Sequence, residues 1–293
     1  MEPSREQAPA NIPSRPANRF AQQSVPPPSR ARLKARLKDF WNSQEVYWSN
    51  LQTESGANSQ VRAHAASFIP QGGRILDVAC GCAANSVPLL QRGKYFGTDI
   101  SQSGLRRARR PGLHLSCADA ESLPFADASF DAAISTYSLE HSVNPARMLS
   151  EIVRVVRPGG RIVLLGPTWD FPFWYPNSLL TRARNPFWRF GYTLKRLSAQ
   201  ILALLGGPSP FLIVEEPDAF SQPFIHDSDA VYVVWSYEVI REMKRFGCAL
   251  VHAGVDSPLL GTNFISKLAK SILRRFPPYR HAGSTALFVF QKS

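Results

Sequence analysis

The chain has 293 residues, with 44% hydrophobic, 19% charged and 11% aromatic side chains. Such a chain can bury a substantial core, which excludes a fully disordered or fibrous protein. Its formal net charge of +12 and pI near 9.9 favour an anionic partner surface, either nucleic acid or membrane.

The N-terminal region divides into two predicted parts. Residues 1–30 are rich in proline, serine, glutamine and alanine, and we predict a disordered arm there. Residues 31–70 are predicted to form a basic and aromatic helical extension, because a basic helical stretch starts at Arg30. This stretch leads into four aromatic residues that we expect to pack against a domain: Phe40, Trp41, Tyr47 and Trp48.

From Gly72 onward, strand and helix signals alternate, which is typical of βαβ units in a parallel, doubly wound sheet. Asn144 is expected to cap a helix whose first residue is Pro145 and which ends at Pro158-Gly159, where Arg157–Gly160 forms a turn. Short apolar runs predict strands at 74–78, 95–98, 113–116, 130–135 and 161–165, and further helices are expected at 85–91 and 102–110.

After Gly166 this alternation stops. Residues 167–230 carry many aromatic residues and prolines, and we interpret them as an insertion with one or two helices that covers the C-terminal edge of the sheet. A helix from Ser236 to Gly247 and strands at 249–253 and 286–291 are expected to complete a domain that spans residues 71–293.

Acidic residues follow successive predicted strands. The strand that contains Asp77 runs into a turn of small residues, Ala79 to Ala84, where a ligand can approach the backbone closely. The next strand ends at Asp99, a carboxylate that can accept hydrogen bonds from both hydroxyls of a ribose, and Asp119 lies twenty residues further on. This spacing predicts a nucleoside cofactor. The absence of a GxGxxG motif disfavours a dinucleotide and therefore a nicotinamide-dependent dehydrogenase.

The full string of motifs resembles the class I S-adenosylmethionine-dependent methyltransferases, in particular the type 11 group that includes the ubiquinone/menaquinone C-methyltransferases. The resemblance implies an α/β, Rossmann-like, seven-stranded sheet that is mostly parallel, with an antiparallel last strand. It also implies S-adenosyl-L-methionine as the cofactor. The matching segments appear in order: 76–81 (LDVACG), 97–101 (GTDIS), 119–125 (DAESLPF), 129–131 (SFD), 139–141 (LEH) and 151–160 (EIVRVVRPGG).

The same resemblance implies a role for individual residues. Asp77, Ala79, Cys80 and Gly81 belong to the loop that would cradle the methionine end of the cofactor, and Ser135 would line the same side. Asp99 would hold the ribose hydroxyls, with Ile100 against the adenine. Asp119 would hydrogen-bond the adenine amino group, and Ala120 would supply a backbone N–H.

The sequence departs from the family at Ala79 and Ala83, where glycine is usual. Alanine fits there only if neither position needs a positive φ. These two substitutions support an alternative reading, a non-catalytic binding or regulatory protein with a methyltransferase fold.

Methyl transfer to oxygen or carbon also needs a base that removes the acceptor's proton. The candidates are His141, after the fourth strand, and His226, in the cluster of residues 226–229 where the insertion returns to the domain. Asp131 is expected to serve the fold. We predict no metal site, since Cys80 and Cys82 are separated by one residue and no histidine cluster accompanies them. Reduced cysteines used as small apolar residues favour a reducing compartment.

The acceptor class follows from what the motifs include and lack. Residues 135–138 read STYS, not the Asn/Asp-Pro-Pro-Tyr/Phe of adenine amino-group methylases, so a nucleic-acid methyltransferase is the weaker alternative. Residues 176–213 and 264–279 are basic and amphipathic; they either lie on anionic lipid or pack on the domain as a substrate lid. We therefore predict a cytoplasmic methyltransferase with a small-molecule or lipid-like acceptor and a peripheral membrane contact.

Overall fold

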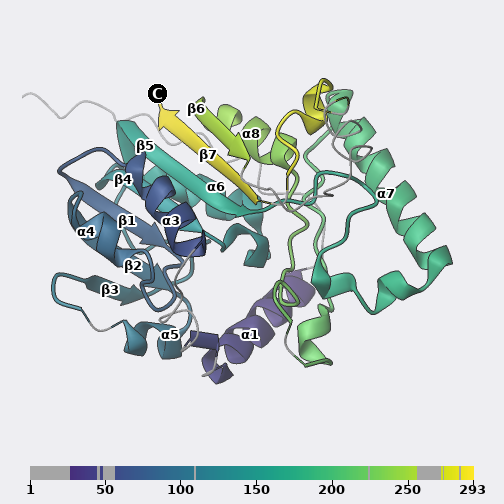
Figure 1. The fold of residues 1–293 in the computed structure, drawn as a ribbon, viewed down its shortest axis with the longest axis horizontal. Coiled ribbons are helices and arrows are strands. Elements are labelled where there is room, and N and C mark those ends of the chain that lie inside the picture. Colours follow the sequence, from purple (N-terminus) through teal and green to yellow (C-terminus); the bar gives the residue numbers. More distant parts are fainter. Residues whose placement is uncertain are drawn as a thin grey trace, which may run out of the picture.

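A seven-stranded sheet forms the centre of the molecule (Figure 1). The structure is a computed structural model that describes residues 27–44, 47–48, 57–108, 110–223, 225–255, 272, 274–283 and 285–293. The strand order is β3-β2-β1-β4-β5-β7-β6. The strands are β1 (Arg74–Val78), β2 (Lys94–Asp99), β3 (His114–Cys117), β4 (Phe130–Thr136), β5 (Val156–Pro167), β6 (Cys248–Val255) and β7 (Thr285–Lys292).

The predicted fold class is confirmed. Strands β1 to β5 pair in parallel, whereas the last strand, β7, runs antiparallel to both β5 and β6. The order reverses between β1 and β4, so the carboxyl ends of these two strands flank the crevice in which open α/β sheets bind ligands.

The two faces of the sheet carry separate cores because side chains alternate along each strand. On one face, Leu76 and Ala133 pack with helices α6 (Pro145–Val155) and α8 (Ser236–Arg245). On the other, Ile75 and Ile134 pack with α3 (Ala57–Ser67) and α4 (Ser86–Leu90). Helix α5 (Gln102–Arg107) follows β2 and has Ser101 as its N-cap.

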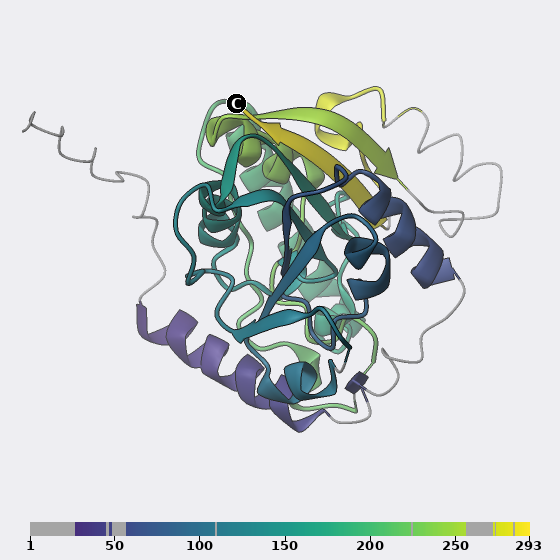
Figure 2. The same cartoon turned by 90° about the vertical axis from the view of Figure 1, so that its left-hand side faces the viewer.

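The first helix, α1 (Pro27–Ser43), lies along the end of the molecule near α5, below the carboxyl ends of the strands (Figures 1 and 2). It begins three residues before the predicted start at Arg30. Helix α3 lies within residues 31–70, the region predicted as a helical extension. Of the predicted disordered arm, residues 1–26 lie outside the described residues.

The segment between β5 and α8 contains one long helix, α7 (Pro186–Leu204), which agrees with the prediction of one or two helices. Short 3-10 turns accompany it at Asn177–Leu179, Arg182–Arg184 and Asp218–Phe220. Most of the second basic stretch, residues 264–271 and 273, lies outside the described residues. In the part of the chain that the structure describes, no helix combines the length and apolarity needed to cross a membrane.

One local prediction is wrong. Residues 157–160 do not form a turn between helix and strand, because α6 ends at Val155 and β5 already begins at Val156. Val156 pairs with Phe130 of β4, and Arg161 pairs with Ala132. The pairing of the two strands is therefore irregular between these positions. The capping prediction is confirmed, since the Asn144 side chain accepts the N–H of Arg147 and Pro145 opens α6.

Candidate functional site

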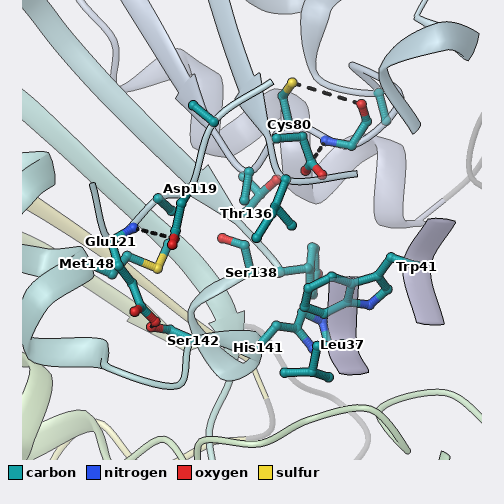
Figure 3. Close-up of a pocket in the computed structure, with 18 of the residues that line it drawn as sticks. Leu37, Trp41, Cys80, Asp119, Glu121, Thr136, Ser138, His141, Ser142 and Met148 are labelled. Atoms are coloured by element: carbon teal, nitrogen blue, oxygen red, sulfur yellow. Dashed lines mark hydrogen bonds between the residues drawn. The ribbon is translucent and has the colours of Figure 1, made fainter. Parts of the chain in front are cut away.

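A cavity opens at the carboxyl ends of β1, β2 and β4 (Figure 3). It holds about 970 Å³ that protein atoms do not fill, its mouth included. Most of the residues predicted from the cofactor motifs line it: Ala79, Cys80, Gly81, Asp99, Ile100, Asp119 and Ala120. Thr136, Ser138, His141 and Met148 also line it.

The loop after β1 has an unusual backbone. Ala79 and Ala83 both have φ of 57°, and Gly81 between them has φ of 55°. The condition under which alanine fits without strain is therefore not met, because this left-handed region disfavours any residue that carries a Cβ. Gly81 is required for a second reason: a Cβ there would lie 2.7 Å from Cζ3 of Trp48.

Asp99, the last residue of β2, binds the backbone of the loop that follows β1. Its carboxylate accepts the N–H of Gly81 at 2.8 Å and the N–H of Ser101 at 2.7 Å. Burial raises the pKa of Asp99, although these backbone donors oppose the shift. Each oxygen keeps a further lone pair, so the buried carboxylate can accept two hydroxyl groups of a ribose.

Asp77 lies beneath the same loop and is fully buried. Its Oδ2 accepts the Tyr95 hydroxyl at 2.9 Å and the Asn85 amide at 3.4 Å, and burial raises the pKa of Asp77 to about 7. Among the described residues, its Oδ1 has no hydrogen-bond donor. Within the cavity, the Asp99 carboxylate fits a ligand that bears a ribose, whereas Asp77 is not among the described residues that line the cavity.

Asp119 is already held by another element of the chain. The Lys34 ammonium of α1 donates to its Oδ2 at 2.7 Å and also donates to Glu121, while Asp119 Oδ1 accepts the N–H of Glu121. Burial opposes the charge of Lys34, but the two carboxylates outweigh this effect and raise its pKa. The carboxylate predicted to bind adenine thus forms a salt bridge that the motifs did not reveal.

Aromatic residues of the N-terminal region cover the cavity. Trp41, at the end of α1, donates its indole N–H to Asp229 Oδ2 at 2.9 Å, and Trp48 donates to the carbonyl of Trp41 at 2.8 Å. Leu37 and Tyr47 complete this cover. The predicted packing of these aromatic residues is confirmed for Trp41 and Trp48, which are held on the ligand site itself.

His141 lies in the short helix η1 (Leu139–His141), beside Trp41 and Leu37 (Figure 3). Its Nδ1 is 3.6 Å from Asp229 Oδ2 and 3.3 Å from the Asp229 carbonyl, and its Nε2 is 3.9 Å from Glu140 Oε1. Burial disfavours the charged imidazole, but Asp229, Glu140 and Asp227 outweigh it, so the pKa of His141 is raised. Burial also raises the pKa of Glu140 to about 8.

Three predicted site residues, Asp77, Ser135 and His226, are not among the described residues that line the cavity. The side chain of His226 is 80% exposed, with Nε2 3.3 Å from Asp227 Oδ1, and His226 is not among the described residues that line the cavity. Ser135 is buried behind the lining, where its hydroxyl contacts that of Ser138. In the described ranges, no cluster of histidine, cysteine or acidic side chains has the make-up of a metal site.

The cavity lining brings together the Asp99 carboxylate, which can accept ribose hydroxyls, and the imidazole of His141. Asp229, which is not among the described lining residues, lies beside Nδ1 of His141. Asp229 belongs to the cluster in which His226 was the candidate base. The structure therefore couples two predicted regions that are 88 residues apart.

Comparison with known proteins is consistent with this geometry. Residues 76–164 match the family described as methyltransferase domain. This match begins in β1 and ends in β5, so it contains the cofactor loop, Asp99, Asp119 and His141.

Two relatives are similar over part of the chain. Demethylmenaquinone methyltransferase of Paenarthrobacter aurescens is 38% identical over 96 residues, which are 32% of this chain and 38% of that protein. Phthiotriol/phenolphthiotriol dimycocerosates methyltransferase of Mycobacterium tuberculosis is 31% identical over 147 residues, 47% of this chain and 52% of that protein. The chain thus spans about half or less of the length of these relatives.

A solved structure supports the fold. Geranyl diphosphate methyltransferase in complex with GPP and sinefungin superposes with a TM-score of 0.55 over 89% of this chain and 100% of that chain, at 14% sequence identity. The likeness extends beyond the matched domain and includes elements on both sides of it.

Proposed function

We propose that this chain, whose residues 76–164 match the family described as methyltransferase domain, is an S-adenosylmethionine-dependent methyltransferase that methylates oxygen or carbon of a small-molecule or lipid-like acceptor. The observation that carries the proposal is the cavity itself. It joins the loop after β1 and the buried carboxylate of Asp99 to a histidine that a second carboxylate orients.

The donor end of the proposed site is formed by this chain's own residues. Asp99 would hold the ribose hydroxyls, Ile100 would contact the adenine, and the loop around Gly81 would leave room for the methionine end. When bound, S-adenosylmethionine supplies a methyl group that is already activated on a positively charged sulfur. The protein's remaining task is to align the acceptor and exclude water, which the cover of Trp41 and Trp48 supports.

His141 is the proposed base. Because Asp229 lies on the Nδ1 side of the ring, Nδ1 keeps its proton and Nε2 is the nitrogen that takes the proton of the acceptor. The acceptor's oxygen or carbon gains the methyl group and loses this proton, which leaves a protonated imidazole that Asp229 stabilises.

The relatives support an apolar acceptor. One relative is a methyltransferase of demethylmenaquinone and another is a methyltransferase of phthiotriol and phenolphthiotriol dimycocerosates. The cavity has an apolar wall that includes Leu37, Trp41, Val143 and Met148. A lipid-like acceptor requires the enzyme to work at or near a membrane. The sequence 135–138, now seen at the end of β4, gives no support to a nucleic-acid acceptor.

Radiolabelled methyl transfer tests this proposal. Purified protein with methyl-labelled S-adenosylmethionine should label a component of a lipid or polar-metabolite extract but not RNA or DNA. His141→Gln should bind the donor as wild type does and lose at least about a hundredfold in rate. His226→Gln is the matched control and should keep full activity. Equal losses in both variants would contradict the assignment of the base.

A second candidate function is supported by the loop after β1 and by Lys34. The strained alanines and the ammonium on Asp119 both oppose cofactor binding, which favours a regulatory protein with no turnover. Calorimetry and the labelling assay together distinguish the two candidate functions. Donor binding without product from any extract would support the non-catalytic function.

A further inference from the structure

Helix α7 buries polar side chains and exposes apolar ones, which is the reverse of an ordinary surface helix. Its buried side chains are Arg196, Gln200 and Ala203, of which the first two are polar. Its outward face is apolar. The helix extends along one side of the molecule, away from the sheet (Figure 1).

Hydrogen bonds fix this orientation. Arg196 is 1% exposed, and its guanidinium donates to the carbonyls of Trp169, Pro172 and Trp174. Gln200 donates its amide N–H to the carbonyl of Asp170 at 3.2 Å. Rotating α7 to bury its apolar face would break these bonds and leave the backbone carbonyls without these donors, so the apolar face stays outward.

The outward residues form one stripe. Phe187, Phe190, Leu194, Ile201 and Leu205 are spaced by three, four, seven and four positions, which places them on a single helical face. Phe187 is 87% exposed, Leu205 80% and Phe190 72%. Monomeric proteins rarely leave a contiguous apolar surface of this kind in water, and such surfaces mark protein or membrane contacts.

The charged residues of the segment that contains the stripe all have one sign. Residues 171–214 contain no aspartate or glutamate. The basic residues of this segment include four that are exposed on or just before α7: Arg182, Arg184, Arg189 and Lys195. An apolar face flanked only by cations is the composition of helices that lie in the interface of an anionic bilayer.

We propose that α7 docks on an anionic lipid membrane, with Phe187, Phe190, Leu194 and Ile201 in the region between headgroups and acyl chains. A second copy of this chain is a poorer occupant. A symmetric contact through the stripe would bring the same arginines and lysines of two molecules together without an acid from this segment to neutralise them. The proposal does not depend on methyl transfer.

Vesicle flotation tests the proposal. Wild-type protein should float with phosphatidylglycerol vesicles at low salt, less at high salt, and weakly with phosphatidylcholine alone. Leu194→Glu should reduce vesicle binding at least about tenfold, because a charge enters the apolar stripe. Val251→Glu is the matched control: Val251 of β6 is 51% exposed, Leu194 is 57% exposed, and the control should bind as wild type does.

Four measurements separate the outcomes. Unchanged melting temperatures show that the variants fold, and unchanged S-adenosylmethionine affinity of Leu194→Glu separates membrane docking from the cofactor site. Undiminished flotation of Leu194→Glu, or no flotation of wild type at low salt, would overturn the proposal. A dimer in light scattering that Leu194→Glu dissociates, with no vesicle binding, would also overturn it in favour of a second copy.

Discussion

The substitution Ala79→Gly should stabilise the protein, although replacing alanine by glycine usually destabilises. Ala79 has φ of 57°, in the left-handed region, where its Cβ is strained. Glycine adopts this backbone freely. The matched control is Ala84→Gly, because Ala84 also lines the cavity and is half-buried but is not among the described residues with positive φ.

The magnitude follows from three effects. Relief of the strain gains about 1–2 kcal/mol, the more flexible unfolded chain costs about 0.4–1 kcal/mol, and the half-buried methyl group costs a few tenths of a kcal/mol, on the order of a partly buried CH₂. The free energy of unfolding should therefore rise by about 0.5 kcal/mol in Ala79→Gly. In Ala84→Gly only the two unfavourable effects remain, so the free energy of unfolding should fall by about 1 kcal/mol.

Urea unfolding followed by tryptophan fluorescence measures both variants against wild type. A shift of the midpoints in opposite directions at constant slope would confirm that backbone strain resides in the cofactor loop. If Ala79→Gly loses as much stability as Ala84→Gly, the positive φ of Ala79 does not strain the loop.

Three further predictions concern charges. Lys34→Met should tighten S-adenosylmethionine binding about threefold to tenfold in calorimetry, since no ammonium then competes for Asp119, whereas Arg36→Met should leave binding unchanged. Asp229→Asn should lower the pKa of His141, seen as an imidazole NMR titration that moves to lower pH. An unmoved titration would contradict the pairing. Burial raises the pKa of Glu140 from 4.5 to about 8, so the folded state retains a proton that the unfolded state loses. Unfolding free energy should therefore fall as pH rises through this range, and should fall less in Glu140→Gln.

Local signals in the sequence were sufficient to predict much of the sheet and the cap of helix α6. Asn144 followed by Pro145 is a typical start of a helix, and α6 begins at Pro145. Asp131 was expected to serve the fold, and it accepts the N–H of Arg74 and the guanidinium of Arg157, which ties β1 to β5. Each of these features depends on neighbours in sequence or on adjacent strands.

The contacts that the sequence did not reveal join distant segments. Lys34 meets Asp119 across 85 positions, and His141 meets Asp229 across 88. No periodicity or motif encodes such a pair. The orientation of α7 was equally hidden, because its amphipathic pattern is the same whether the apolar or the polar side faces the protein, and only the buried Arg196 distinguishes the two.

Helix α1 holds both ends of the cavity through two side chains, seven positions apart. Lys34 holds the predicted adenine carboxylate, and Trp41 holds the carboxylate that orients His141. Because both side chains belong to the same helix, any displacement of α1 would break the contacts at Asp119 and at Asp229 together.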